Sequence, residues 1–395
     1  MIYSAFQDKQ LSLLGFGTMR LPVDENGTID QEQVNAMTDY ALAHGVNYFD
    51  TAYPYHESMS EIAIGKALAR HPRESFYLAD KYPGHQIVET YNPAEIFEEQ
   101  LKKCGVEYFD FYLLHNVNEM SIGTYRDPRW GILEYFKEQK RLGRIKHLGC
   151  SCHGRMPMMK EWLEEVHEDM EFCQIQLNYL DWTLQEAKEK YDLITSYGIP
   201  VWVMEPVRGG KLANLNENQT ARLREIEPDK STASWGFRFL QTLPNVKMVL
   251  SGMSNMEQMV DNVNTFDSRI ALSDAEFKLV LDIAEELKDA VPCTACRYCC
   301  DGCPMGLNIP MLIETYNDLR LGTNVNLAMR WEALPPEKQS SACIGCGKCA
   351  KVCPQNINIP DVMKKMTELA KTLPSWVEIS RQRAEAAAKQ KAAGK

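Results

Sequence analysis

The chain has 395 residues, a formal net charge of -11 and a pI of about 5.4. That length allows one large domain with a small one, or two to three ordinary domains. The negative charge argues against nonspecific binding to nucleic acid or to an anionic membrane. The sequence contains no leader-like N-terminus and no apolar run of about 18 residues or more, so we expect a cytoplasmic protein without a membrane span.

Short apolar or β-branched runs alternate with amphipathic segments from Leu11 to about Leu287. The eight runs are LSLLGFG, NYFDTA, SFYLADK, YFDFYLLH, IKHLGCS, FCQIQLNY, PVWVMEP and KMVLSGM. Their alternation with helical segments predicts βα units and a parallel sheet. Eight units over about 250 residues fit a closed barrel, and no strand is followed by the G-x-G-x-x-G of an open doubly wound sheet. We therefore predict an α/β fold, a (β/α)8 TIM barrel.

The pattern changes near Asp289, where strand-like alternation stops and helical segments without strands follow. We predict a barrel over residues 1–288, a mainly α-helical domain over 289–375 and a basic helical tail over 376–395. We interpret the tail as a solvated helix, with docking of a partner as the alternative.

Nine of the 13 cysteines lie between Cys293 and Cys353. Cytosolic thiols are kept reduced, so this density indicates a metal site rather than a set of disulfides. The spacing C-x2-C-x2-C-x3-C-P occurs twice, and the second copy, which ends with Pro354, lies 50 positions after the first (343 − 293 = 50). Bacterial two-cluster ferredoxins use this pattern, and the fourth cysteine of each copy binds the other cluster.

The duplicated pattern therefore predicts two 4Fe–4S clusters with exchanged ligands. One set is Cys293, Cys296, Cys299 and Cys353, and the other is Cys343, Cys346, Cys349 and Cys303. Structural zinc sites would not explain a third and a fourth cysteine at fixed spacing before proline. The long helical sequence between the two copies resembles the α-helical ferredoxin domains of succinate dehydrogenase iron–sulfur subunits.

Three consecutive predicted strands end in a titratable side chain, namely Asp50, Lys81 and His115, and Tyr55 follows the first of them. The carboxyl ends of barrel strands converge on one mouth, so we expect these four side chains to meet. An ammonium beside a phenol favours its ionised form and lowers its pKa, which would make Tyr55 a proton donor for a carbonyl. Each residue alone has an ordinary structural interpretation, but three at successive strand ends with Tyr55 just after the first favour a catalytic site.

The motifs GFGTMRLP, NYFDTAYPYHESMSEIAIGKAL, ADK and DFYLLHN closely resemble those of the aldo/keto reductases, over about residues 11–288. The subgroup that is most similar carries a C-terminal 4Fe–4S ferredoxin domain. The resemblance implies a catalytic tetrad of Asp50, Tyr55, Lys81 and His115, the cofactor NAD(P)H and a small-molecule carbonyl substrate.

By the same resemblance, the cofactor is expected to contact Gly17, Thr18, Met19, Asp50, Ser151, Gln174, Met204, Pro206, Gly209, Gly210, Gly252, Ser254, Gln258 and Asn262. The sequence departs from the family at two of the nicotinamide positions. Cys152 replaces the asparagine that usually follows Ser151, and Met204 replaces the usual stacking aromatic. Arg208 and Lys211 are candidates for a pyrophosphate contact or for ordinary rim charges.

Three functional hypotheses follow. In the first, the protein is an iron–sulfur oxidoreductase that reduces a carbonyl with Tyr55 as proton donor and NAD(P)H as hydride source, while the clusters transfer electrons. In the second, it is an electron-transfer protein fed by a ferredoxin-type partner, without nicotinamide hydride transfer. In the third, the clusters are structural and attach the C-terminal helices to the barrel.

Overall fold

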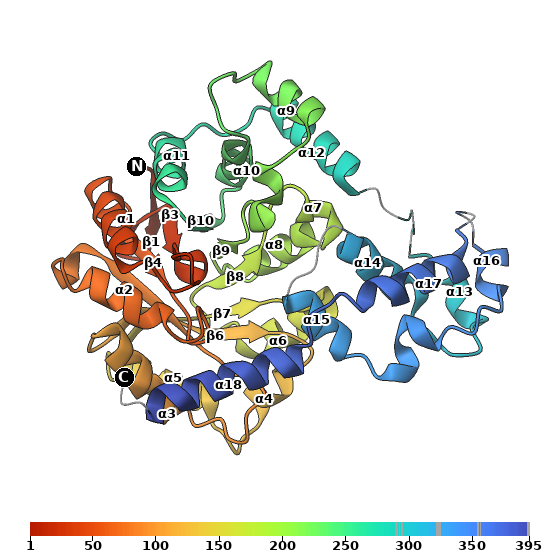
Figure 1. The fold of residues 1–395 in the computed structure, drawn as a ribbon, viewed down its shortest axis with the longest axis horizontal. Coiled ribbons are helices and arrows are strands. Elements are labelled where there is room, and N and C mark those ends of the chain that lie inside the picture. Colours follow the sequence, from red (N-terminus) through yellow and green to blue (C-terminus); the bar gives the residue numbers. More distant parts are fainter. Residues whose placement is uncertain are drawn as a thin grey trace. The chain divides into compact units, whose positions relative to one another are not determined.

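The structure is a computed structural model that describes residues 1–288, 291, 293, 295–320, 325–353, 355 and 357–392. Pro354 of the duplicated pattern and Asp289, the first residue of the second predicted domain, lie outside these residues. The chain forms two compact units (Figure 1). One unit contains Met1–Leu281 and the residues from Arg383 onward, and the other contains Asp282–Gln382. In the described part of the chain, no helix is long and apolar enough to cross a membrane.

Eight parallel strands form a closed barrel in the first unit, which confirms the predicted fold. In barrel order after β10, the strands follow the chain from β3 to β9. The strands are β3 (Leu14–Gly17), β4 (Tyr48–Asp50), β5 (Tyr77–Tyr82), β6 (Phe109–Val117), β7 (Ile145–Cys152), β8 (Cys173–Gln176), β9 (Val201–Met204) and β10 (Val246–Gly252).

Helices connect the barrel strands, two more follow the last strand, and local sequence explains their ends. In the third of them the Asn92 side chain accepts hydrogen bonds from the first-turn N–H groups, and Gly105 ends the helix with a φ of 67°. The helices are α1 (Gln31–Ala43), α2 (Ser60–Leu68), α3 (Pro93–Cys104), α4 (Ile122–Arg126), α5 (Ile132–Arg141), α6 (Met156–Val166), α7 (Asp181–Leu184), α8 (Ala187–Ser196), α9 (Glu217–Arg224), α10 (Thr232–Gln241), α11 (Met256–Thr265) and α12 (Asp274–Lys288).

Aromatic side chains fill the N-terminal end of the barrel interior. A hairpin of β1 (Tyr3–Phe6) and β2 (Lys9–Ser12) precedes the barrel, and Phe6 packs inside it. The Phe6 ring lies 5.6 Å from that of Phe111 and 5.1 Å from that of Trp202. This buried layer closes one end, so that polar side chains at the opposite, C-terminal strand ends can form a site.

The second unit is helical, as predicted, and repeats its own structure. Its helices are α13 (Tyr298–Asp301), α14 (Ile309–Arg320), α15 (Val325–Glu332), α16 (Lys348–Lys351), α17 (Ile359–Ala370) and the start of α18 (Trp376–Ala392). α16 begins 50 residues after α13, and α17 begins 50 residues after α14 (348 − 298 and 359 − 309). Apolar side chains such as Leu312 and Met363 form a core between the two halves.

Candidate functional site

The structure brings together the four residues that the sequence predicts at the barrel mouth. Lys81 Nζ donates hydrogen bonds to Asp50 Oδ1 and to the Thr51 carbonyl oxygen, each at 2.5 Å. The same ammonium lies 5.0 Å from the centre of the Tyr55 ring. The Tyr55 ring meets that of His115 edge-on, with 5.9 Å between their centres. The side chains come from the ends of β4, β5 and β6 and from the loop after β4.

Burial controls the electrostatics of the tetrad. Burial raises the pKa of the Tyr55 phenol, and the Lys81 ammonium offsets only part of this rise. The sequence-based expectation of a lowered pKa is therefore wrong, because desolvation outweighs the neighbouring charge. Although burial acts to lower it, Asp50 and Tyr55 raise the pKa of Lys81 above its usual value, so Lys81 is charged at neutral pH.

His115 is neutral in this environment. Burial lowers its pKa well below the usual value, and the neighbouring His85 and Lys81 act in the same direction. Its Nδ1 atom is buried and has no hydrogen-bond partner. The His85 ring lies 4.6 Å from the His115 ring, and burial lowers the pKa of His85 to about 3. A neutral imidazole keeps one N–H donor, which can hydrogen-bond a substrate oxygen without adding charge.

Three predicted nicotinamide contacts lie next to one another on adjacent strands. Ser151 on β7 pairs with Gln174 on β8, and Gln176 of that strand pairs with Met204 on β9. The Ser151 hydroxyl accepts the Asn116 N–H at 2.7 Å. The amide nitrogen of Gln174 donates to Met204 Sδ at 3.5 Å, while its buried Oε1 has no partner. This orphaned acceptor fits the N–H groups of a carboxamide, so these residues are compatible with a nicotinamide.

The glycines that were predicted to contact the cofactor lie around an arginine, Arg20, which the sequence alone did not point to. A Cβ atom on Gly252 would lie 3.3 Å from Arg20 Cβ, and one on Gly209 would lie 3.3 Å from Arg20 Nη2. Gly209 and Gly210 have φ values of 63° and 93°, which side chains rarely adopt. The exposed Arg20 therefore lies between the loop after β9 and the end of β10, where glycines leave room for it. The sequence feature that could have identified Arg20 is its position directly after the motif GFGTM.

Other predicted cofactor residues have structural roles in the same region. The Thr18 hydroxyl donates to the Asp50 carbonyl oxygen at 2.9 Å, so it fixes the strand end that carries the tetrad carboxylate. The Ser254 N–H donates to Gln258 Oε1 at 2.8 Å. The buried Asn262 amide donates to the Ser251 hydroxyl at 2.9 Å. Of the remaining predicted residues, Gly17 pairs with Gly252, Met19 is half exposed and Pro206 is buried.

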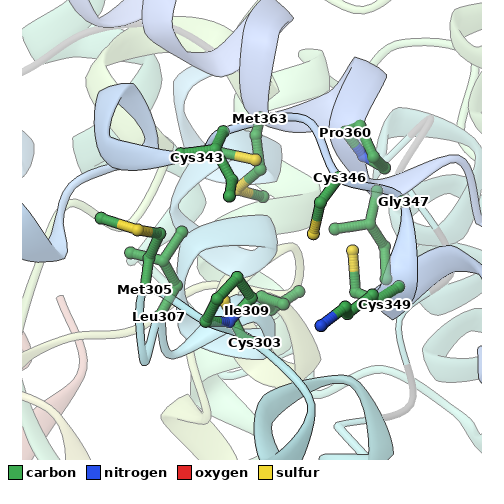
Figure 2. Close-up of a pocket in the computed structure, with 14 residues that line it drawn as sticks. Cys303, Met305, Leu307, Ile309, Cys343, Cys346, Gly347, Cys349, Pro360 and Met363 are labelled. Atoms are coloured by element: carbon green, nitrogen blue, oxygen red, sulfur yellow. The ribbon is translucent and has the colours of Figure 1, made fainter.

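The cysteines of the second unit gather in two pockets of similar size. One pocket, of about 360 Å³, is lined by Cys303, Cys343, Cys346 and Cys349. Figure 2 shows the sulfur atoms of Cys346 and Cys349 directed toward one another across this pocket. The other, of about 310 Å³, is lined by Cys293, Cys296, Cys299 and Cys353. Each set combines three cysteines of one copy with the fourth of the other, as the pattern predicts.

The chemistry of both pockets fits iron–sulfur clusters. Four cysteines provide the soft thiolates that a 4Fe–4S cluster requires. Apolar side chains form much of the remaining linings, among them Ile309 and Met363 in the first pocket and Ile313 and Ile357 in the second, and Lys348, Arg297 and Gln355 also line them. Apolar surroundings limit the access of water, which affects the reduction potential of a bound cluster.

A closed parallel barrel with titratable residues at its C-terminal strand ends places the first unit among the (β/α)8 enzymes. Comparison with known proteins identifies the family. Residues 13–285 match the model of the aldo/keto reductase family, and the chain belongs to this family. The protein is accordingly an oxidoreductase. Residues 292–357 match the model of a 4Fe-4S dicluster domain, so the chain also carries an iron–sulfur domain.

Individual relatives are similar to this chain at low identity. The NADH-specific methylglyoxal reductase of Escherichia coli is 25% identical over 326 residues, which cover 71% of this chain and 97% of the relative. Probable aldo-keto reductase 1 of Glycine max is 27% identical over 52% of this chain and 58% of its own length. Among solved structures, the holo form of aldo-keto reductase AKR11C1 from Bacillus halodurans is 26% identical with a TM-score of 0.57, covering 70% of this chain and 93% of that one.

Proposed function

We propose that the protein reduces the carbonyl group of a small molecule with NAD(P)H, and that Tyr55 donates the proton. The observation that carries this proposal is the buried ion pair of Lys81 and Asp50 beside the Tyr55 ring. A buried ion pair is costly to desolvate, and such pairs with perturbed pKa values are concentrated in functional sites. The unpartnered Gln174 oxygen and the nicotinamide named for the Escherichia coli relative support the choice of cofactor.

The tetrad residues have distinct tasks in this reaction. When bound, NAD(P)H supplies a hydride to the carbonyl carbon. Tyr55 transfers its hydroxyl proton to the carbonyl oxygen, which gives the alcohol and leaves a phenolate. Lys81 stabilises that phenolate as its charge develops, and Asp50 keeps Lys81 charged and oriented. The neutral His115 donates a hydrogen bond to the substrate oxygen and so polarises the carbonyl group.

We further propose that each cysteine-lined pocket holds one 4Fe–4S cluster. The ligands are Cys293, Cys296, Cys299 and Cys353 for one cluster, and Cys343, Cys346, Cys349 and Cys303 for the other. A cluster transfers single electrons, so its natural partner is a redox protein of the ferredoxin class.

We also propose that the chain consists of a barrel domain over residues 1–288, an iron–sulfur domain over residues 289–375 and a helical tail over residues 376–395.

The two cysteine-lined pockets also favour a second candidate function. A nicotinamide delivers two electrons together as hydride, whereas each cluster passes one electron at a time. In this alternative, a ferredoxin-type partner reduces the clusters, which deliver single electrons to a substrate in the barrel, and Tyr55 supplies the proton. The tetrad is compatible with both reactions, and the electron source distinguishes them.

Anaerobic addition of NADPH or NADH to the purified full-length protein distinguishes nicotinamide-dependent reduction from electron supply through the clusters. The proposal predicts nicotinamide binding, followed by cofactor oxidation when small aldehydes and ketones are added. Absorbance of the clusters is recorded in the same cuvette. Failure to bind either nicotinamide, together with clusters that bleach only with a low-potential donor, would replace the proposal with the second candidate.

A further inference from the structure

A buried group of three cysteines lies in the barrel, separate from the iron–sulfur pockets. Only four of the 13 cysteines lie outside residues 293–353, and three of these four converge. Cys150 Sγ lies 3.9 Å from Cys152 Sγ and 3.8 Å from Cys173 Sγ. All three sulfur atoms lie within 4.8 Å of one another and are almost fully shielded from solvent. We call Cys150, Cys152 and Cys173 the barrel thiol group.

Strand geometry explains why these side chains meet. Alternate residues of a strand point to opposite faces, so Cys150 and Cys152 on β7 share one face while Ser151 between them points the other way. Parallel register places Cys173 on β8 beside Cys150 and Gln174 beside Ser151. Ser151 and Gln174 are predicted cofactor contacts, so the barrel thiol group lies on the outer face of the strand segments that carry them.

We propose that the barrel thiol group binds one soft monovalent metal ion, Cu(I). Metal–thiolate bonds of about 2.3 Å place the corners of a trigonal three-sulfur site about 4 Å apart. The separations of Cys150 Sγ from Cys152 Sγ and from Cys173 Sγ match that spacing without any rearrangement of the strands. Thiolates select soft ions, chiefly Cu(I) and Zn(II). A closed zinc site takes four ligands, and the described residues contribute only three to this group, which favours Cu(I).

Enclosure and a neighbouring positive charge are also consistent with a thiolate-bound ion. Three thiolates around Cu(I) carry a net charge of minus two. The nearly buried Lys190 of α8 is close enough to interact electrostatically with Cys152, and it offsets part of that charge. α8 adjoins β8 and β9 on the outside of the barrel (Figure 1). Binding requires all three cysteines as thiolates, so their thiol protons pass to solvent, and it involves no change of oxidation state when copper is supplied as Cu(I).

A copper competition experiment on the full-length protein tests the proposal. Anaerobically purified wild-type protein, Cys150→Ser and Cys104→Ser are loaded with Cu(I) and titrated with a Cu(I)-specific chelator. Cys104 is the matched control, because it is equally buried but lies outside the group. We expect wild type and Cys104→Ser to retain one more copper per chain than Cys150→Ser, at chelator concentrations at least about tenfold higher. Equal loss of copper from all three proteins overturns the proposal.

A second readout needs only the wild-type protein and therefore stands if a variant fails to fold. Cysteine alkylation in mild denaturant is followed peptide by peptide, with and without Cu(I). The proposal predicts that Cu(I) slows the labelling of Cys150, Cys152 and Cys173 at least about tenfold and leaves that of Cys104 unchanged. Unchanged labelling of the three, or a disulfide between Cys150 and Cys173 in the anaerobic protein, contradicts it.

Discussion

Lys81 Nζ lies 2.5 Å from Asp50 Oδ1, with 0% and 4% of the two side chains exposed. Both charges are held away from water and next to the Tyr55 ring. Burial alone would neutralise either group, so each depends on the other to stay ionised. The catalytic competence of the barrel should therefore depend on this pair as a unit.

Tyr55→Phe should abolish most carbonyl reduction, because it removes the hydroxyl group that donates the proton and keeps the ring. A general acid contributes about 10²–10⁴-fold, so we expect kcat to fall within that range. Iron content and nicotinamide affinity should remain at the wild-type level. Tyr53→Phe is the control, since Tyr53 is buried nearby but its hydroxyl lies 3.4 Å from Glu99 rather than in the tetrad. Equal losses in both variants would remove Tyr55 from its proposed role.

Lys81→Met should inactivate the protein and destabilise the barrel by about 3–5 kcal/mol, because it leaves the Asp50 charge buried without a partner. Adding Asp50→Asn removes that charge, so the double variant should regain part of the unfolding free energy but no activity. Denaturant titrations of wild type, Lys81→Met, Asp50→Asn and the double variant measure the coupling. Additive losses in the double variant would show that the two side chains are not paired.

Asp80→Asn should change how stability depends on pH. Burial, followed by the charge of Glu61, raises the pKa of Asp80 well above its usual value. Asp80 is then protonated when folded and ionised when unfolded, so its contribution to the unfolding free energy falls as pH rises above about 4. The fall continues to the folded-state pKa and is at most about 1.4 kcal/mol per pH unit.

Unfolding measured between about pH 5 and pH 8 should show the variant gaining stability relative to wild type as pH rises. Asn can still accept the Lys81 backbone N–H that Asp80 Oδ1 accepts at 2.8 Å. Parallel profiles for the two proteins would mean that Asp80 is ionised in the folded barrel.

Cys303→Ala and Cys343→Ala should each remove one cluster, and the double variant should lose no more iron than either single variant. Both residues line the same pocket. Iron should fall from about eight to about four per chain in all three proteins. If Cys303 instead completed the cluster of its own copy, the double variant would lose nearly all its iron. Cys300→Ala, a neighbouring cysteine outside the pattern, should keep full iron content.

The sequence predicted those features that depend on local pattern. Eight apolar runs predicted the barrel strands, although the first run, LSLLGFG, contributes to both β2 and β3. The 50-residue repeat predicted which cysteines share a pocket, because each copy of the motif leaves its fourth cysteine near the other copy.

Features set by tertiary contacts were not predictable in the same way. Cys173 meets Cys150 only because of the register between β7 and β8, which no local pattern encodes. Arg20 was missed because its neighbours, Gly209 after β9 and Gly252 at the end of β10, are distant in the sequence. The raised pKa of Tyr55 depends on burial, and burial depends on the folded barrel.

Isotope transfer tests the proposed reaction most directly. Full-length protein is incubated anaerobically with NADPH or NADH that carries deuterium at the transferable C4 position, and with small aldehydes and ketones. Our account predicts an alcohol with deuterium on the former carbonyl carbon, formed by wild type and at most about one hundredth as fast by Tyr55→Phe. Alcohol formed only with a low-potential one-electron donor, and free of deuterium, would contradict it.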